Sequence, residues 1–413
     1  MRQLLEGGRV LSAPLNGIRV IEVANWLAAP AATRLMADLG ADVIKVEPPA
    51  GDMLRHFALR SLGYDYQFTD SPAFEVDNFG KRSITIDLEK PGGPELVKQL
   101  AADCDIFVLN LTRARRDHFG LGFNELAAIN PRVVYASLTA YGSEGPDQDR
   151  GGFDYAAFWA RSGIMSLLGE PSEPPPSCRA GQGDHSTALN LLAAVLIGLR
   201  QRDATGEAQH VELSLQGTGL WSIAGDASTA LVAGQNPPRV SRDAPTHPLR
   251  NVYRCGDDRW VLLVNPSPFP DRWPAFCSVL GHPEWAGPGY WDSMDRFIAD
   301  SASAVAAIDP VMATRSLADW GADFDRNGII WAPVATLLEA LNDPQVREMG
   351  WVTKTEGSFG PIETLNAPFK VYGADVGIRG PAPRPGQHTF DVLADLGIDD
   401  DTLDRLASDG VLG

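Results

Sequence analysis

The residue with the clearest chemical potential in this 413-residue chain is Asp184, in the run GQGDHSTALNLL. It precedes an apolar stretch that predicts a helix, and the first backbone N–H groups of a helix have no partner within it. One interpretation is an N-cap aspartate, because Asp is among the residues preferred there. The other is a nucleophilic carboxylate, held where Gly181 and Gly183 let a substrate approach the backbone and where the helix start stabilises negative charge. The spacing alone favours the N-cap.

Other titratable residues show weaker patterns. His185 could act as a general base, but adjacent residues at a helix start point in different directions, so we expect a structural or solvent-exposed role. Two interpretations, a solvated helix face or a phosphate contact, are open for the basic cluster Arg113, Arg115 and Arg116. The same two are open for the cations near predicted strand ends, which are Lys45, Lys81 and Arg82.

Several common functional motifs are missing. The fragment GKRS at 80–83 resembles the end of a P-loop, but the required first glycine would fall at Glu75. The segment VANWLAAPAAT after the first predicted strand has no G-x-G-x-x-G, and the chain has no G-x-S-x-G. Its four cysteines form no C-x-x-C pair and have no histidine at metal-ligand spacing. The sequence therefore predicts no dinucleotide fingerprint, serine hydrolase, zinc site or disulfide framework. The scattered cysteines fit a protein of the reducing cytoplasm best.

Alternating strands and helices position these residues. We expect strands over 17–23, 42–46, 83–88, 105–109 and 133–138, with helices over 30–39, 93–102 and 124–129 between them. An apolar helix over 186–201 and a strand over 210–215 follow. Repeated β-then-α order predicts an α/β fold, a parallel Rossmann-like sheet with helices on both faces. The Pro-rich segment 235–248 marks a boundary, after which 253–264 predicts a hairpin and the start of a smaller α+β domain.

The charge is strongly and unevenly negative. The formal net charge is −18, which makes nucleic acid or an anionic membrane an unsuitable partner. The longest apolar segment, 188–199, is too short to span a bilayer, and the N-terminus lacks a signal-peptide pattern. Residues 1–250 carry 23 basic and 29 acidic side chains, whereas 251–413 carry 12 and 24. We therefore expect any anion-binding site in the first part.

Five stretches occur in an order and spacing that resemble a known family. They are LNGIRVIEVANWLAAPAATRLMADLGADVIKVEPPAGD, NFGKRSITIDLEKPGGPEL, HFGLGFNELAAINPRVVYASLTAYG, GQGDHSTALNLLAAVLIGLRQRDATGEAQHVELSL and GQHTFDVLADLGI. Together they resemble the class III (CaiB/BaiF-type) CoA-transferases, which include formyl-CoA transferase, carnitine CoA-transferase and the α-methylacyl-CoA racemases. The resemblance covers nearly the whole chain.

The resemblance implies a fold and an activity. It implies a large CoA-binding domain built from 1–232 and 336–413, a small domain over 233–335, and a homodimer of interlinked chains. It places the family's nucleophilic aspartate at Asp184, which reverses the N-cap interpretation. The implied reaction moves CoA from an acyl-CoA to a carboxylic acid acceptor through an aspartyl mixed anhydride and an aspartyl-CoA thioester. CoA is then a thioester substrate, and no metal or redox cofactor is needed.

The resemblance also implies which residues contact CoA. They are Leu27, Ala28, Pro48, Ile86, Asp87, Leu88, Glu89, Asn110, Leu111, Thr112, His118, Thr139, Ala140, Tyr141 and Gly142. Some depart from formyl-CoA transferase, which has a glutamine at the position of Leu27 and arginines at those of Pro48 and His118. The cluster Arg113–Arg116 is a candidate for the missing cations.

Two other functions share this resemblance. A racemase needs a base on each side of the α-carbon. In the racemase branch one base is a histidine, at the position where this chain has Phe153. The other is a glutamate, which aligns near Ser267 of this chain. Transfer is therefore preferred to racemisation, and a non-catalytic CoA-binding protein is the third alternative. An apolar lining would suit a bulky or hydrophobic acyl chain, although the same residues could equally be core, namely Trp26, Leu27, Phe153, Phe158 and Trp159.

Overall fold

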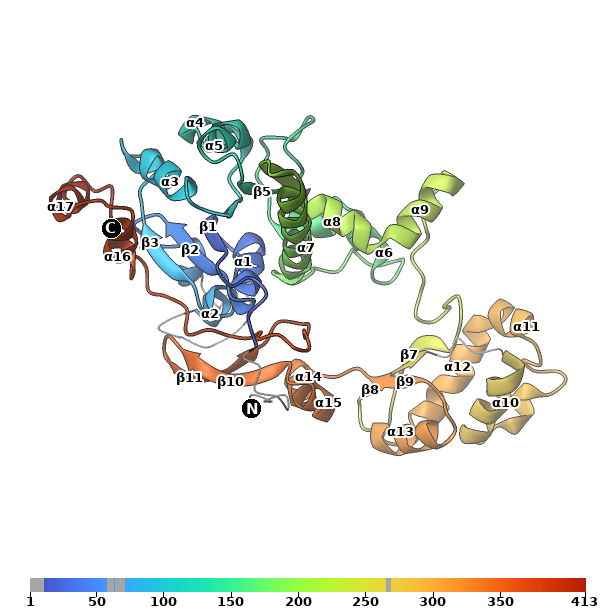
Figure 1. Ribbon diagram of the computed structural model, residues 1–413. Helices are drawn as coiled ribbons and strands as arrows, with labels where there is room; N and C mark the ends of the chain where they lie inside the picture. Colours follow the sequence, from blue (N-terminus) through green and yellow to red (C-terminus); the bar gives the residue numbers. More distant parts are fainter. Residues whose placement is uncertain (1–10, 58–62, 64–70, 265–268) are drawn as a thin grey trace. The chain divides into compact units, whose positions relative to one another are not determined.

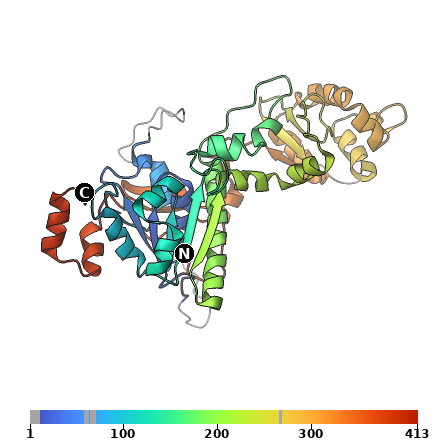
Figure 2. The ribbon, with the colours of Figure 1, turned by 90° about the horizontal axis from the view of Figure 1, so that it is seen from above.

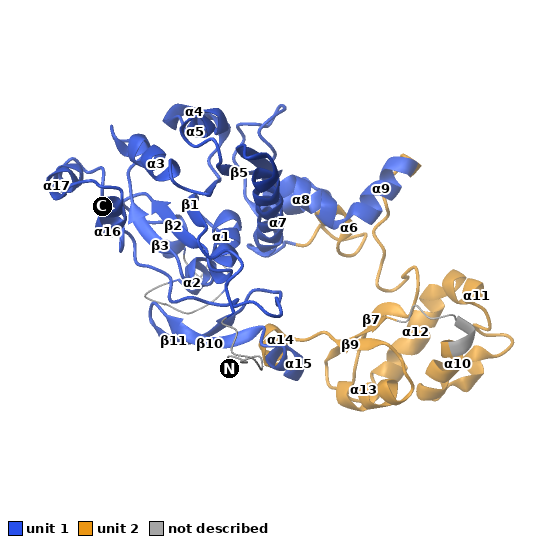
Figure 3. Ribbon diagram, viewed as in Figure 1, with its two compact units in different colours: residues 1–164, 177–232, 344–413 blue, residues 165–176, 233–343 orange. Residues whose placement is uncertain are grey.

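A computed structural model describes residues 11–57, 63, 71–264 and 269–413. The chain divides into two compact units, coloured separately in Figure 3. The first comprises 1–164, 177–232 and 344–413, and the second comprises 165–176 and 233–343.

The first unit is built on a six-stranded parallel sheet (Figure 1). Its spatial order is β3-β2-β1-β4-β5-β6, and in the register Val20 lies opposite both Val43 and Ile106. The strands are β1 (Arg19–Val23), β2 (Asp42–Glu47), β3 (Arg82–Thr85), β4 (Ile106–Leu109), β5 (Val134–Thr139) and β6 (Gln209–Ser214). The predicted α/β class and parallel sheet are confirmed. Strand β3 ends earlier than predicted because the chain turns at Asp87, whose side chain accepts a hydrogen bond from Glu89 N–H.

Helices cover both faces of this sheet because successive strand side chains point to opposite sides. Val20 packs in the core formed with α1 and α7, whereas Ile21 packs in the core formed with α3, α5, α16 and α17. The helices of this unit are α1 (Ala28–Asp38), α2 (Pro72–Asn78), α3 (Gly93–Ala101), α4 (Arg113–Phe119), α5 (Phe123–Ile129), α7 (Gln182–Thr205), α8 (Leu215–Ser222), α9 (Ala224–Ala233), α15 (Pro344–Glu348), α16 (Thr389–Asp395) and α17 (Asp400–Ser408). A 3-10 turn (Met53–His56), a π-helical turn (Tyr155–Ala160) and the hairpin β10 (Val352–Gly357) and β11 (Gly360–Leu365) complete it.

The C-terminal helix α16 covers the edge strand β3. Figure 1 shows α16 beside β3 with α17 beyond it, and Figure 2 shows both helices (red) at one side of the first unit. Ser83 N–H donates to His388 Nδ1 at 3.1 Å, and Thr85 N–H donates to Thr389 Oγ1 at 3.0 Å. The C-terminal segment thus satisfies backbone groups that an open edge would expose.

The second unit has its own small sheet and core. The antiparallel strands are β7 (Arg250–Arg254), β8 (Trp260–Val264) and β9 (Trp331–Pro333), which confirms the predicted hairpin. Its helices are α10 (Phe269–Val279), α11 (Met294–Ala299), α12 (Ser301–Met312), α13 (Leu317–Arg326) and α14 (Leu337–Asn342), and α6 (Ile164–Leu167) lies at the junction of the two units. Aromatic side chains such as Trp273, Phe297 and Trp320 fill the core. In the described part of the chain, no helix combines the length and apolar character that a bilayer crossing requires.

Candidate active site

The residues expected to contact CoA lie at one edge of the parallel sheet. They follow the carboxyl ends of β1, β2, β3, β4 and β5, and His118 lies on α4 directly after β4. The order of the sheet reverses between β1 and β4, and ligands of open α/β sheets bind outside the carboxyl ends of strands at such a point. The fold therefore brings these segments together, although their contact with CoA stays a prediction.

The side chains in these segments differ in what they can offer a ligand. Ile86 and Ala28 are buried in the apolar core, so only their backbone atoms are candidates for contact. Asn110 is already engaged: its Nδ2 donates to Asn25 O at 2.7 Å, and its Oδ1 accepts from Asn25 N–H at 3.2 Å. Asn110 thus ties the loop after β1 to the loop after β4. His118 and Pro48 are exposed.

Asp184 lies within helix α7 and is not its N-cap. The helix begins four residues earlier than predicted, at Gln182, with Gly181 as the N-cap at φ +90°. That left-handed conformation favours glycine. Asp184 is therefore in the first turn and half-buried. The N-cap interpretation is wrong because another carboxylate satisfies the first N–H groups of the helix.

That carboxylate belongs to Asp154, which sequence reasoning missed. Its Oδ2 accepts hydrogen bonds from Gly181 N–H at 2.9 Å and Gly183 N–H at 3.3 Å. A side chain at Gly183 would also strike Phe158, because a Cβ there would lie 2.6 Å from the ring. The two glycines thus serve packing and capping, and their role in substrate approach stays a prediction. The available signal was an isolated carboxylate in the otherwise apolar run GGFDYAAFWA.

His185 is a charged neighbour of Asp184 and has a structural role, as expected. Its Nε2 lies 3.0 Å from Asp77 Oδ1, and its Nδ1 lies 2.8 Å from Gly181 O. Both partners are acceptors, so both ring nitrogens donate and the ring is an imidazolium. The Asp77 carboxylate accordingly raises the pKa of His185 to about 9. Asp77, on α2, is a second residue that sequence reasoning missed.

The pKa of Asp184 is raised to about 7. Burial is the largest cause, and the negative charges of Asp154 and Asp77 raise the pKa further, while the His185 cation lowers it. Among the described residues, no donor forms a hydrogen bond with the Asp184 carboxylate. The site therefore presents an unpaired carboxylate that ionises near neutral pH.

The basic residues singled out in the sequence have different environments. Lys45 and Lys81 are fully buried and both pair with Glu22, at 2.7 and 2.8 Å, so the solvated-face and phosphate-contact interpretations are both wrong for them. Arg82 pairs with Asp42 at 2.6 Å. Arg113 and Arg115 are exposed on α4, where Arg115 pairs with Glu89 at 2.9 Å. These two arginines lie at the same sheet edge as the expected CoA contacts.

The proposed apolar lining is divided between core and surface. Phe158 is buried in the core with α1 and α7 and is not available as a lining, whereas Trp159 is partly buried and packs against that core. Trp26 and Phe153 lie outside that core and meet edge to face, with ring centroids 5.2 Å apart. Phe153 offers no base, and Ser267 lies outside the described residues.

Comparisons with known proteins agree on one family. A family model described as CoA-transferase family III matches residues 15–389. The chain is 28% identical to an (R)-2-hydroxy-4-methylpentanoate CoA-transferase of Clostridioides difficile, over 96% of this chain and 99% of the relative. It is 29% identical to a cinnamoyl-CoA:phenyllactate CoA-transferase of Clostridium sporogenes, over 95% and 96%. The crystal structure of a CaiB/BaiF family protein from Brucella suis superposes with a TM-score of 0.83 at 28% identity, covering 93% of this chain and 100% of that chain. General CoA transfer is the activity that these relatives support, and the chain belongs to CoA-transferase family III.

Proposed function

We propose that this protein moves CoA from an acyl-CoA donor to a free carboxylic acid through covalent intermediates on Asp184. The observation that carries the proposal is the unpaired, half-buried Asp184 carboxylate with a pKa of about 7, in the first turn of α7. A nucleophilic carboxylate needs unshared lone pairs and an ionised fraction at the working pH. No donor bonds to the Asp184 oxygens among the described residues, and a pKa of about 7 leaves about half of the group ionised at neutral pH.

The proposed reaction conserves every atom and charge. The Asp184 carboxylate attacks the donor thioester carbonyl, the C–S bond breaks, and CoA thiolate leaves a mixed anhydride. The thiolate then attacks the aspartyl carbonyl, which releases the donor acid as a carboxylate and forms an aspartyl-CoA thioester. The acceptor carboxylate attacks that thioester to form a second mixed anhydride, and the thiolate takes the acceptor acyl group and restores Asp184. No redox step occurs, so the proposal involves CoA as substrate and neither a metal nor a redox cofactor.

CoA is proposed to lie along the carboxyl edge of the sheet, over the loops after β1 to β5. The phosphates are assigned to Arg113 and Arg115, the exposed cations of α4. The ion pair of Arg115 with Glu89 is solvent-exposed, and such pairs contribute little, so a phosphate can replace the carboxylate. Cys104, Cys255 and Cys277 are free thiols, which suits the cytoplasmic location that we propose.

Trapping the intermediate tests the proposal. The protein is incubated with a panel of acyl-CoAs and free acids and quenched with hydroxylamine, which converts an aspartyl thioester or anhydride to a hydroxamate. Peptide mass spectrometry is expected to locate the hydroxamate on Asp184, together with exchange of CoA between acids. Deuterium incorporation at the α-carbon without CoA exchange would instead support the racemase. CoA binding with neither reaction would support a non-catalytic protein.

The acid limb of the activity profile should follow the ionisation of Asp184. The nucleophile is the carboxylate, so kcat/KM is expected to be full above the Asp184 pKa of about 7 and to fall as the pH drops through it. Asp154→Asn removes a negative charge that raises this pKa while keeping an oxygen for Gly181 N–H. The acid limb is expected to move to lower pH by roughly one unit. Asp203→Asn, at the other end of α7, should leave the acid limb at the wild-type pH. An acid limb that does not move in Asp154→Asn would show that the charge of Asp154 does not raise the pKa of Asp184.

We also propose a homodimer, as the family resemblance implies. Helix α9 has no buried residue, yet it exposes Leu231 by 85% and Val232 by 89%, and Trp221 at the end of α8 is 75% exposed. Apolar side chains gathered on adjacent helices are typical of an interface. Light scattering is expected to give twice the chain mass of 44.5 kDa for the wild type and a shift toward the monomer for Leu231→Glu. A monodisperse wild-type monomer would exclude the dimer.

A further inference from the structure

Six charged side chains form one ion-pair network beside β1, β2 and β3, of which five are buried and Arg55 is 11% exposed. We call them the buried charge cluster: Glu22, Lys45, Glu47, Asp52, Arg55 and Lys81. Lys45 Nζ lies 2.7 Å from Glu22 Oε1 and 2.8 Å from Asp52 Oδ2. Lys81 Nζ lies 2.8 Å from the other oxygen of Glu22, and Arg55 pairs with Glu47 at 2.6 Å. Three acids and three bases thus compensate one another away from water.

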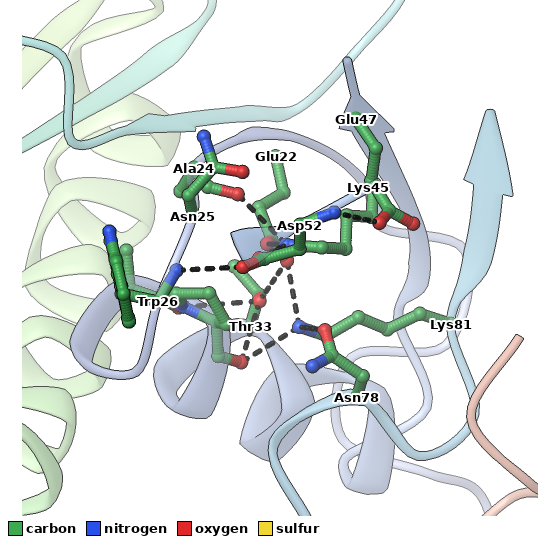
Figure 4. Close-up of polar contacts among 12 residues, drawn as sticks. Glu22, Ala24, Asn25, Trp26, Thr33, Lys45, Glu47, Asp52, Asn78 and Lys81 are labelled. Carbon is green, nitrogen blue, oxygen red and sulfur yellow. Dashed lines mark hydrogen bonds and ion pairs between the residues drawn. The ribbon is translucent and has the colours of Figure 1, made fainter. Parts of the chain in front are cut away.

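The cluster also binds the backbone of the loop between β1 and α1 and of the first turn of α1 (Figure 4). Lys45 Nζ donates to Ala24 O at 2.8 Å, and Lys81 Nζ donates to Pro30 O at 2.8 Å. Between these points, Asp52 Oδ1 accepts a hydrogen bond from Trp26 N–H at 3.1 Å. Asn110 holds the intervening Asn25 through both its N–H and its carbonyl. The loop is therefore fixed by Lys45, Asp52 and Asn110, and Lys81 holds the first turn of α1 beside it.

Trp26 has a backbone conformation that requires such support. Its φ is +71°, and among the described non-glycine residues only Asp258 shares a positive φ. Asp258 belongs to a hairpin turn and is of a residue type that tolerates this region, whereas a tryptophan does so rarely. A strained backbone persists only where the surrounding structure determines it. The hydrogen bond from Trp26 N–H to Asp52 holds Trp26 in this conformation, and Lys45 in turn holds Asp52 through an ion pair.

The strained conformation directs the Trp26 ring toward Phe57 and Phe153, beside the first turn of α7. The ring meets Phe153 edge to face at 5.2 Å and Phe57 at 6.2 Å. Phe153 is bonded to Asp154, which caps the first turn of α7. Leu27, the next residue after Trp26, lies 3.7 Å from the Cβ position of Gly181 at the same turn. The aromatic wall of Trp26, Phe57 and Phe153 thus borders the turn that carries Asp184.

We propose that Asp52, held by Lys45, is a positioning residue that locks Trp26 in its strained conformation, so that the aromatic wall selects bulky apolar acyl groups over short ones. This inference rests on the proposed function. The buried charge cluster would then contribute to the choice of acyl group, in addition to the mutual neutralisation of its acidic and basic side chains. Planar or branched acyl chains would bury their surface against the three rings, whereas an acetyl group would leave the rings in water.

The test compares selectivity and loop conformation in matched variants. CoA transfer to propionate is measured with phenylacetyl-CoA and with acetyl-CoA as donors, and the ratio of the two kcat/KM values is the readout. Asp52→Ala and Trp26→Gly are each expected to lower this ratio by about tenfold, mainly through KM for phenylacetyl-CoA. Asp38→Asn is the control, because Asp38 is equally buried but pairs with Arg34 on its own helix. It should leave the ratio unchanged.

A crystal structure of each variant makes the outcome independent of turnover. In Asp52→Ala, residue 26 is expected to leave the positive-φ region. If that variant does not fold, Asp52→Leu replaces it, because leucine is similar in size and offers no acceptor to Trp26 N–H. Trp26 remaining at positive φ without the Asp52 acceptor, or a selectivity ratio equal to that of the wild type, would overturn the inference. A wild type that forms no adduct on Asp184 would instead overturn the proposed function, while the loop conformation would still decide the role of Asp52.

Discussion

Asp184→Ala is expected to lower kcat/KM for CoA transfer by at least about 10³-fold, because removing the nucleophile of a covalent mechanism costs roughly 10³ to 10⁶. The loss should appear in kcat, since the carboxylate reacts with the acyl carbon after binding is complete. Affinity for acyl-CoA should be kept or increased, because the variant also removes a negative charge from the site. Steady-state kinetics with a radiolabelled acceptor acid and titration calorimetry with the acyl-CoA measure the two quantities.

The matched control for this variant is Asp203→Ala. Asp203 is on the same helix, but it is exposed near the C-terminal end and pairs with Arg202. It should retain near wild-type kinetics. Activity within tenfold of the wild type in a folded Asp184→Ala protein would contradict the assignment of the nucleophile.

Glu22→Gln is expected to produce the largest loss of stability. Glu22 is fully buried and is the shared anion of Lys45 and Lys81. Those two cations hold the pKa of Glu22 down at about 2, although burial alone would raise it. Glutamine keeps the shape but leaves two buried ammonium groups beside a neutral amide. Removing one partner of a buried pair costs about 3–5 kcal/mol, so the Tm should fall by roughly 10 °C.

The comparison for Glu22→Gln is Glu363→Gln, in the same unit. Glu363 pairs with Arg347 on the surface, where an ion pair contributes little. Differential scanning calorimetry should show a Tm within about 2 °C of the wild type for Glu363→Gln. Equal effects in the two variants would show that the buried charge cluster does not stabilise the fold.

The sheet was predictable from the sequence because its signals are local. Strands such as β1 and β4 are short apolar runs between turn residues, and their ends match the prediction within one or two residues. The start of α7 was not predictable in the same way. An aspartate before an apolar helix is usually its cap, but here the cap comes from Asp154, about thirty positions earlier in the chain. Only the tertiary fold brings that carboxylate to the helix.

The burial of Lys45 and Lys81 was also not predictable from local sequence signals. Lys45 and Lys81 follow strand patterns, and a cation at a strand end in an α/β fold is often a phosphate ligand. Their burial depends on Glu22, which reaches them only when β1, β2 and β3 are in register. A charged residue inside each apolar strand, as in GIRVIEV and DVIKV, was the available signal that the charges pair inside the protein. Asp184 itself was found through the motif resemblance, not through its spacing.

The high pKa of Asp184 has a consequence for the fate of the first mixed anhydride. The thiolate can attack either of its two carbonyl carbons, and the departing group is then the carboxylate on the other side. An ordinary carboxylic acid ionises near about 4, so it is a weaker base and a better leaving group than Asp184 at about 7. Attack on the aspartyl carbonyl, which expels the substrate acid, is thereby favoured over return to the starting thioester. The same preference applies to the second mixed anhydride, so the buried position between Asp154 and Asp77 favours the aspartyl-CoA thioester in both halves of the reaction.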